Sequence, residues 1–332
     1  MKILYIPHCY SQQRQRQKRR KIYPVLLAMQ AQYYRERGHE VYWNPDNTSG
    51  HYDKVITEPE DIPFRQLPPP DRIFTKWWEY QNNGNFKYLP GTYIMSASGC
   101  LWGRCLFCVE SLKNSVFVRP SDSILEEIIQ CHEMGFREIF DDSATFPDGE
   151  WLDAFCDDII ALKLPIRLGC NLRLDAKADY RKMREAGFRM VLFGLESINQ
   201  DTLDRIHKGN IDVNRVESTL KKASEAGLEP HISYMVGYPW ETPKDTMNTV
   251  RFVRKMLIKG YAKTAQSSYY NPLLKGNPEG EHLKKYLDRH YSAALNPIFW
   301  YNKFRDIKTR EDIEYIWRGI KEGVKWMFRL ES

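Results

Sequence analysis

The feature that most constrains the fold of this chain is a phrase that recurs four times, in which a helical stretch ends in glycine and an apolar run follows. The glycines are Gly135, Gly187, Gly227 and Gly260. Glycine just past a helix accepts the left-handed backbone that closes the helix, and a short apolar run after such a signal is typical of a buried strand. The pattern therefore predicts strands that alternate with helices.

Two more apolar runs, residues 92–97 and 165–171, bring the predicted strands to six between about residues 92 and 270. Strands joined by helices favour a parallel sheet with right-handed crossovers. An open doubly wound sheet and an incomplete barrel both satisfy this pattern, so the sequence leaves both open. The helix in SDSILEEIIQCHEMG is expected to begin with a capping box between Ser123 and Glu126.

Polar side chains follow the predicted strands. A loop with three cysteines follows the first strand, and the later strands are followed by Asp141 and Asp142, by Asn171 and Arg173, by Glu196, by residues 237–242, and by Tyr269, Tyr270 and Asn271. Ligands of parallel α/β folds bind at the carboxyl ends of the strands. We therefore expect these groups to face one cavity.

The flanks differ in character from this core. The beginning of the chain has the pattern of one β-α-β unit, and the stretch after it contains LPPPD and QNNGN, which are typical of a linker. The predicted organisation is a truncated β-α-β segment (1–60), a linker (61–91), a core of strand and helix units (92–271) and a mainly helical extension (272–332).

Composition narrows the class of protein. The chain is 42% hydrophobic and 28% charged, and it has no apolar run near the ~20 residues that a membrane span needs. Apart from Lys2, its N-terminal positive charges follow the short apolar start, unlike those of a secretory signal, so we expect a cytoplasmic protein. The net charge of +6 is modest. The densest basic cluster, Arg14–Lys21, is expected to be a solvated loop, with contact to nucleic acid as the alternative.

Three of the seven cysteines, Cys100, Cys105 and Cys108, lie within nine positions. An odd number with such crowding favours metal or redox chemistry over a disulfide framework. A structural zinc site needs four ligands, and the next candidates, Cys131 and His132, lie in the helix downstream. Three thiolates can instead hold three corners of a [4Fe–4S] cluster. Spacing favours the cluster but leaves zinc open.

The loop SGCLWGRCLFCVE resembles the signature of the radical SAM (S-adenosylmethionine) enzymes, in which three cysteines bind a [4Fe–4S] cluster. That family usually has three residues between the first two cysteines, whereas this chain has four, and Gly103 permits the bulge. Downstream, IFDDSATF, GLESINQDTL and YMVGYPWET resemble successive strand-end motifs of the subgroup related to cobalamin-dependent enzymes, with Trp240 where glycine is common. The family's fold is a partial (βα)6 barrel, which agrees with the six predicted units.

This resemblance implies that Cys100, Cys105 and Cys108 hold the cluster and that its open iron binds SAM. The reduced cluster would cleave SAM to a 5′-deoxyadenosyl radical, which abstracts hydrogen from a substrate that the sequence does not identify. The electron donor would be a low-potential flavodoxin or ferredoxin. Contacts to SAM are implied for Phe107 at the adenine, Asp141 and Asp142 at the amino group, Arg173 at the carboxylate, Glu196 at the ribose and Gly237 at the adenine.

Several other residues near the strand ends have two interpretations. Cys170 can face the cavity, although buried cysteine is more often a small apolar filler. Tyr269 and Tyr270 are candidates for substrate contact, with core packing as the favoured alternative. His207 and Lys208 are expected on a solvated turn.

The N-terminal segment resembles the opening of the cobalamin-binding domain that precedes many such barrels. It is too short for the complete domain and lacks the D-x-H-x-x-G motif, so bound cobalamin is not expected. A cobalamin-dependent radical SAM methyltransferase is nevertheless one alternative function. From other classes, the alternatives are a non-catalytic iron–sulfur electron carrier and a zinc-stabilised nucleic-acid-binding module, which leave the ordered strand-end motifs unexplained.

Overall fold

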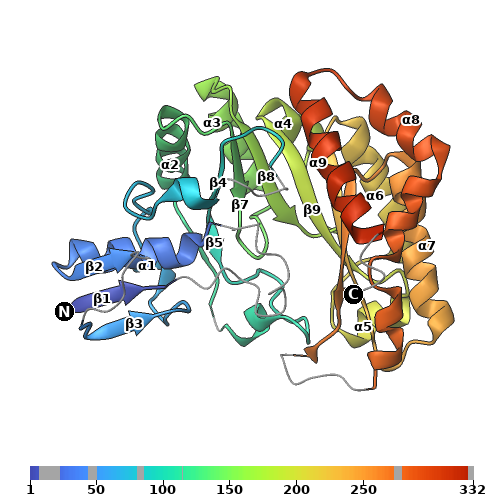
Figure 1. The fold of residues 1–332 in the computed structure, drawn as a ribbon, viewed down its shortest axis with the longest axis horizontal. Coiled ribbons are helices and arrows are strands. Elements are labelled where there is room, and N and C mark those ends of the chain that lie inside the picture. The colour runs from blue at the N-terminus through green and yellow to red at the C-terminus, as the bar shows by residue number, and fades with distance from the viewer. Residues whose placement is uncertain (7–22, 44–50, 81–85, 114, 273–278, 328–332) are drawn as a thin grey trace. The chain divides into compact units, whose positions relative to one another are not determined.

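The computed structural model describes residues 1–6, 23–43, 51–80, 86–113, 115–272 and 279–327 (Figure 1). Contacts divide the chain into two compact units, residues 1–98 with 117–142, and residues 99–116 with 143–332. The first unit thus contains the predicted linker and two strands of the predicted core. The basic cluster Arg14–Lys21 lies outside the described residues.

The first unit begins with a small parallel sheet in the order β2-β1-β3. Its β-α-β start is present as predicted, and β3 adds a third strand on the other side of β1. The elements of this unit are β1 (Lys2–Tyr5), α1 (Val25–Glu36), β2 (Glu40–Trp43), β3 (Lys54–Ile56), the 3-10 helices η2 (Phe64–Gln66) and η3 (Trp77–Tyr80), β4 (Gly91–Ile94), β5 (Ala97–Ser98), β6 (Phe117–Val118), α2 (Ser121–Glu133) and β7 (Glu138–Asp141).

The stretch expected as a linker is packed into this unit. Arg72 is only 3% exposed, and its guanidinium lies 2.6 Å from a carboxylate oxygen of Glu127, whose other oxygen pairs with Arg119. Arg72 also donates to the carbonyl of Tyr93 in β4. A buried carboxylate with two arginine partners is a satisfied structural network, so the described residues 61–80 and 86–91 contribute to the core of the first unit.

The capping box predicted for α2 is wrong. The helix begins two residues earlier, at Ser121, directly after Pro120, and no side chain caps it. Ser123 instead accepts a hydrogen bond from Arg119 through its hydroxyl. Pro120 is itself the N-cap residue, with φ −52° and ψ 136°, so Ser123 already lies inside the helix and cannot serve as its cap.

The strand order decides between the two architectures that the sequence left open. The large sheet has the order β11-β10-β9-β8-β7-β4, so each strand neighbours the next in the chain. A doubly wound sheet reverses its order near the middle, and this sheet does not. The strand pairs β4–β7, β8–β9, β9–β10 and β10–β11 are parallel. The fold is therefore an α/β fold of the partial (βα)6 barrel type.

The second unit contributes four of these strands with their helices and the C-terminal extension. Its elements are η4 (Val109–Leu112), α3 (Glu150–Leu162), β8 (Arg167–Leu172), α4 (Tyr180–Glu185), β9 (Phe188–Glu196), α5 (Gln200–Arg205), α6 (Val213–Glu225), β10 (Glu229–Val236), α7 (Pro243–Lys259), β11 (Thr264–Tyr269), η6 (Glu281–Tyr286), η7 (Arg289–Leu295), α8 (Pro297–Arg305) and α9 (Arg310–Met327). The four predicted helix-closing glycines all have positive φ, between 75° and 94°.

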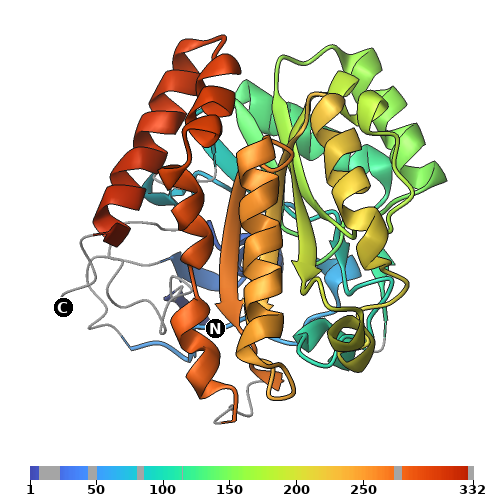
Figure 2. The same ribbon diagram turned by 90° about the vertical axis from the view of Figure 1, so that its right-hand side faces the viewer.

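The helices of the second unit cover one side of its strands. Helix α4 packs on β9, α6 on β10, and α7 on both β10 and β11, and Figure 2 shows α7 running alongside the strands. Tyr234 of β10 donates to His290 of η7 on this same side. The extension is mainly helical, as predicted, and α8 packs against α7. Among the described residues, no helix is both long and apolar enough to cross a membrane.

Candidate active site

The three clustered cysteines lie on one loop of the second unit. Gly103 in this loop has φ +57°, and a Cβ at that position would lie 3.0 Å from the carbonyl oxygen of Cys100, so glycine accommodates the extra residue as predicted. The amide of Cys108 donates to the carbonyl of Cys105 (3.1 Å), which closes a turn between these two cysteines. The sulfur of Cys100 lies 3.3 Å from the hydroxyl of Thr145.

The three thiols are free of disulfide bonds. Burial raises the pKa of the Cys105 thiol to about 11, against the positive charge of Lys208, which acts to lower it. Burial also raises the pKa of Cys108. In the part of the chain that the structure describes, no three Cys, His, Asp or Glu side chains stand close enough together to hold a metal ion. The ligand-free thiols of Cys105 and Cys108 are therefore protonated at neutral pH, and metal binding must release those protons.

A buried ion pair between Glu196 and Lys208 lies beside this loop. The two side chains are 5% and 8% exposed, and Lys208 Nζ is 2.8 Å from Glu196 Oε1. Burial alone would lower the pKa of Lys208, but the Glu196 carboxylate keeps it above its ordinary value. Glu196 Oε2 is also buried and has no hydrogen-bond partner among the described residues.

The backbone is adapted to this pair. Glu196 ends β9 with φ +63°, a conformation that is uncommon for residues other than glycine and that clusters at functional sites. Two residues earlier, a Cβ on Gly194 would lie 2.7 Å from Glu196 Oε1 and 2.9 Å from Lys208 Nζ. Glycine at position 194 therefore lets the ion pair lie directly on the strand.

The prediction of a solvated turn is wrong for Lys208 and right for His207, which is exposed. Three hydrogen bonds hold the loop that turns Lys208 inward: Trp102 Nε1 donates to the His207 carbonyl (2.6 Å), Arg173 Nη2 to the Lys208 carbonyl (2.9 Å) and the Leu106 amide to the Ile206 carbonyl (3.1 Å). Two of these three donors belong to the cysteine loop. The cysteine loop and the Lys208 loop are therefore built as one structure.

Arg173 supports this arrangement. Its fork makes two hydrogen bonds of 2.8 Å to Asp175, and its guanidinium lies 4.8 Å from the ring centroid of Trp102. Gly209 has φ +101°, and a Cβ there would lie 2.5 Å from Arg173 Nη2, so this glycine permits the close approach. The predicted contact of Arg173 with a SAM carboxylate stays a prediction, since the fork is paired within the protein. Phe107 is half-buried, with its ring centroid 5.8 Å from Lys208 Nζ.

A second buried carboxylate, Glu241, joins two of the sequence motifs. It is 6% exposed and accepts hydrogen bonds from four side chains: Ser197, Asn199 and Thr202 to Oε1, and Thr246 to Oε2. The first three donors belong to GLESINQDTL, and Glu241 belongs to YMVGYPWET. The adjacent Thr242 and Asp245 form a capping box that begins α7. Glu241 thus fixes the β9–α5 turn against the β10–α7 turn.

An aromatic cluster surrounds Gly237. This glycine has φ +96°, and a Cβ there would lie 2.2 Å from the ring of Tyr269, so Tyr269 occupies the space that glycine leaves open. The rings of Trp240 and Tyr270 lie 5.6 and 4.7 Å from that of Tyr238. Tyr270 is buried, in agreement with core packing. The contact predicted between Gly237 and adenine stays a prediction.

The remaining predicted residues have clear positions. In the first unit, Asp141 ends β7 and accepts hydrogen bonds from the amide (2.8 Å) and the hydroxyl of Ser96. Asp142, the next residue in the chain, is exposed. In the second unit, Cys170 is fully buried beside Tyr180 of α4. Cys170 is therefore the apolar filler that the sequence favoured.

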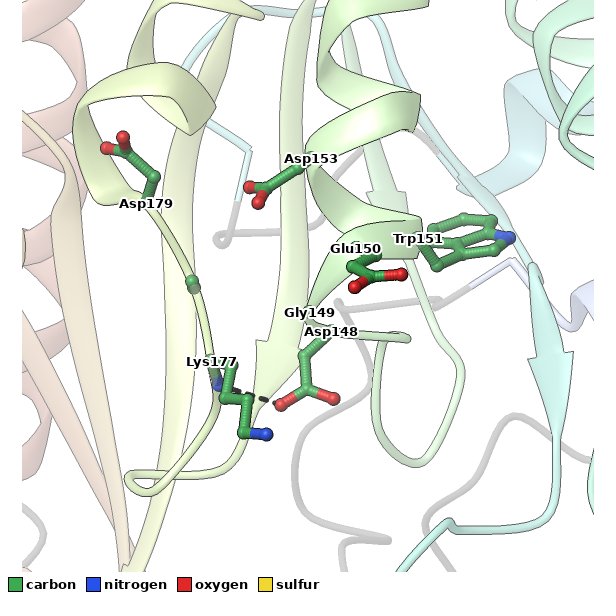
Figure 3. A pocket seen from close by; sticks show the side chains of 8 residues that line it. Asp148, Gly149, Glu150, Trp151, Asp153, Lys177 and Asp179 are labelled. Carbon is green, nitrogen blue, oxygen red and sulfur yellow. Dashed lines mark hydrogen bonds between the residues drawn. The ribbon is translucent and has the colours of Figure 1, made fainter.

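A cleft of about 690 Å³ lies elsewhere in the second unit, between the start of α3 and the loop before α4 (Figure 3). Its lining includes Asp148, Asp153, Lys177 and Asp179. Asp148 accepts from the Lys177 amide, and Asp179 caps α4 through the amides of its first turn. The cleft contains none of the predicted site residues, and two of its carboxylates support local structure.

Comparison with known proteins identifies the family. Residues 94–253 match the Radical SAM superfamily. This region includes the cysteine loop, the Glu196–Lys208 ion pair and Glu241, whereas Tyr269 and Tyr270 of the aromatic cluster lie beyond it. The chain therefore carries a radical SAM domain over residues 94–253.

Individual relatives cover parts of the chain. A curated relative, the uncharacterized methyltransferase PH0819 of Pyrococcus horikoshii, is 27% identical over 205 residues, which are 58% of this chain and 42% of that protein. Among solved structures, the methyltransferase TsrM of Kitasatospora setae is 18% identical with a TM-score of 0.49, over 64% of this chain and 37% of its own. The cobalamin-dependent enzyme OxsB is 14% identical with a TM-score of 0.48, over 75% and 36%. This chain spans less than half the length of these relatives.

Sequence reasoning missed three residues of this site. Lys208 was expected in solvent, and the tyrosine and glutamate of GYPWET, Tyr238 and Glu241, received no separate role. The sequence around Lys208, between His207 and Gly209, does not indicate that its side chain is buried. This burial depends on hydrogen bonds from Trp102 and Arg173, which are distant in sequence.

Proposed function

We propose that this protein reductively cleaves SAM at a [4Fe–4S] cluster bound by Cys100, Cys105 and Cys108, and uses the 5′-deoxyadenosyl radical to abstract hydrogen from a substrate. When bound, the reduced cluster supplies the electron that breaks the sulfonium bond. The protein binds and orients the reactants and excludes water, as in other cofactor enzymes.

The observation that carries this proposal is the position of three free thiols beside a buried carboxylate with one unpartnered oxygen. Burying a carboxylate oxygen without a hydrogen bond is costly, so Glu196 Oε2 is suited to a ligand with a donor group. The thiols supply the soft ligands that iron–sulfur clusters require. The donor set of the loop therefore fits the cluster, and the ion pair fits a polar ligand next to it.

Each residue has a role in this proposal. Glu196 accepts a hydrogen bond from a ribose hydroxyl of SAM through Oε2, while Lys208 holds Oε1 and adds positive charge near Cys105. Phe107 and the backbone at Gly237 lie along the adenine. Asp142 receives the SAM ammonium group, beside Asp141. Arg173 braces the loop of Lys208 and is our candidate for the SAM carboxylate.

The partners follow from this chemistry. A low-potential flavodoxin or ferredoxin supplies the electron, in the reducing conditions of the cytoplasm that keep free cysteines reduced. The substrate is not identified by this chemistry. We include nucleic acid as one proposed substrate because of the basic cluster Arg14–Lys21.

A second candidate is a cobalamin-dependent radical SAM methyltransferase. The parallel sheet β2-β1-β3 in the first unit and the name of the curated relative, a methyltransferase, favour it more than the sequence alone did. Its test is anaerobic incubation with hydroxocobalamin, followed by gel filtration and absorbance. Cobalamin that stays with the protein in an equimolar amount supports this candidate, and complete loss of cobalamin argues against it.

The main proposal is tested by cluster assembly. We expect anaerobic reconstitution with iron and sulfide to give about four irons per chain, and we expect Cys100→Ala, Cys105→Ala and Cys108→Ala each to lose them. The matched control is Cys156→Ala, which removes a buried thiol of α3 and should retain iron. Zinc in place of iron, or full iron content in the Cys105 variant, would contradict the proposal.

A further inference from the structure

Two buried polar atoms of the second unit lack hydrogen-bond partners among the described residues, and their side chains influence each other electrostatically. Glu196 Oε2 is one, and the hydroxyl of Tyr238 is the other, since neither has a hydrogen-bond partner among the described residues. Tyr238 is fully buried and Glu196 is 5% exposed. An unpaired buried hydroxyl and an unpaired buried carboxylate oxygen each cost free energy, so their joint presence calls for a cause.

Packing fixes the Tyr238 ring and with it the hydroxyl. The ring packs against both Trp240, at 5.6 Å with an interplanar angle of 29°, and Tyr270, at 4.7 Å with 42°, and these two rings also contact each other. Trp240 is itself held, because its indole nitrogen donates to the Thr202 hydroxyl (3.2 Å). The Tyr238 hydroxyl therefore cannot turn away to reach water.

The groups that face this hydroxyl belong to the site. Burial and then the charges of Glu196 and Glu241 raise the pKa of Tyr238 well above 10, with smaller effects from Tyr270 and Cys105. Glu241 already accepts four hydrogen bonds, whereas Glu196 accepts from Lys208 alone. Glu196 is thus the nearby carboxylate that still has an oxygen to share.

The chemistry of the two free atoms is complementary. A neutral tyrosine hydroxyl can donate, and an ionised carboxylate can only accept. A hydroxyl group, of a ligand or of water, satisfies both, because it accepts one hydrogen bond and donates another. An ammonium group could not accept from Tyr238, and a carboxylate could not donate to Glu196.

We propose that Tyr238 contacts the cofactor: its hydroxyl donates a hydrogen bond to a ribose hydroxyl of SAM, and that ribose hydroxyl donates to Glu196 Oε2. This inference rests on the proposed function and adds a donor to it. Lys208 acts as the positioning residue that keeps Glu196 Oε1 occupied and leaves Oε2 for the ligand.

The test measures SAM binding without turnover. Reconstituted protein in the oxidised state is titrated anaerobically with SAM, 2′-deoxy-SAM and 3′-deoxy-SAM in a calorimeter, for wild type, Tyr238→Phe and Tyr234→Phe. The last variant is the matched control, since its hydroxyl donates to His290 on the helix-covered side of the sheet. Thermal unfolding of each ligand-free variant is measured alongside.

We expect Tyr238→Phe to bind SAM roughly tenfold more weakly, which is the range of one neutral hydrogen bond. One deoxy analogue should bind wild type more weakly than SAM, and Tyr238→Phe should lose most of that discrimination. The unfolding temperature of ligand-free Tyr238→Phe should not fall, because the hydroxyl has no partner to lose. Tyr234→Phe should instead lose stability and keep its SAM affinity.

Two results would overturn the inference while leaving the proposed function intact. They are unchanged SAM affinity of Tyr238→Phe, and full discrimination between SAM and its deoxy analogues in that variant. Wild-type protein that carries four irons and does not bind SAM would overturn both the proposed function and this inference.

Discussion

Two buried carboxylates in the second unit have opposite surroundings. Glu241 accepts four hydrogen bonds from serine, threonine and asparagine side chains on its own and the neighbouring turn. Within the described ranges of the chain, Glu196 has one partner, Lys208, and its Oε2 is unpaired. Both side chains are about equally buried, at 6% and 5% exposure. Burial alone therefore does not distinguish these two carboxylates, whereas the number of hydrogen bonds that each accepts does.

The backbone conformations of Glu241 and Glu196 differ as well. Glu241 precedes a regular capping box at the start of α7, whereas Glu196 adopts a left-handed conformation at the end of β9. Strain that persists at a buried residue indicates that surrounding contacts hold it there. The region around Glu241 is thus built to close two turns, and the region around Glu196 is built to present one oxygen.

The largest expected loss of stability comes from removing the ion-pair partner of Glu196. Lys208→Met leaves a buried carboxylate without its ion-pair partner, and we expect it to lower the free energy of unfolding by about 3–5 kcal/mol. The double variant Lys208→Met/Glu196→Gln removes both charges and should recover most of that loss. Urea unfolding of the ligand-free proteins measures both. A double variant as unstable as the single one would contradict the account of the ion pair.

A smaller effect concerns pH and His231 of β10, another buried group with one unpaired nitrogen. Burial, with a contribution from His290, lowers its pKa to about 4. Because the unfolded chain takes up a proton near pH 6.5 and the folded chain does not, stability falls as pH drops from about 6.5 to 4. For this shift the loss is about 3 kcal/mol at pH 4.

The comparison of wild type with His231→Gln isolates this group. Glutamine does not titrate, so the variant should lose less stability across that pH window than wild type does. Thermal unfolding at several pH values between 4 and 7.5 measures the two slopes. Parallel slopes would show that His231 is already protonated in the folded protein or that it is not buried.

The smallest effect tests the Glu241 region. Glu241→Gln replaces one acceptor by a donor that faces Thr246 or the serine and asparagine donors, and we expect a loss of about 1–3 kcal/mol in stability. SAM affinity of the reconstituted variant should stay close to that of wild type. Loss of SAM binding with unchanged stability would place Glu241 in the binding site and would remove the distinction between the two carboxylates.

Much of the fold could be predicted because its signals are local. The glycines that close the helices predicted where the following strands begin, and each of these glycines has a positive φ in the structure. The strand order was beyond the sequence, because periodicity is the same in a doubly wound sheet and in a barrel. The start of α2 was missed because Pro120 had a stronger effect than the serine and glutamate that form a capping-box pattern downstream.

The site residues also differ in whether a local sequence signal predicts them. The cysteine spacing and Glu196 carry local signals, such as crowded thiols and a carboxylate at the end of an apolar strand. Lys208 does not, because its burial depends on a hydrogen bond between Trp102 and the His207 carbonyl. The free hydroxyl of Tyr238 also depends on which neighbouring carboxylate is already saturated, and only the structure shows that.

The most direct measurement of the central claim is 5′-deoxyadenosine formation. Anaerobically reconstituted wild type and Cys105→Ala are incubated with dithionite and SAM, and the nucleoside and methionine are quantified by chromatography. Our account predicts both products in equal amounts from wild type and neither from the variant. A wild-type protein with four irons and bound SAM that forms no 5′-deoxyadenosine, or a variant that forms as much as wild type, would contradict it.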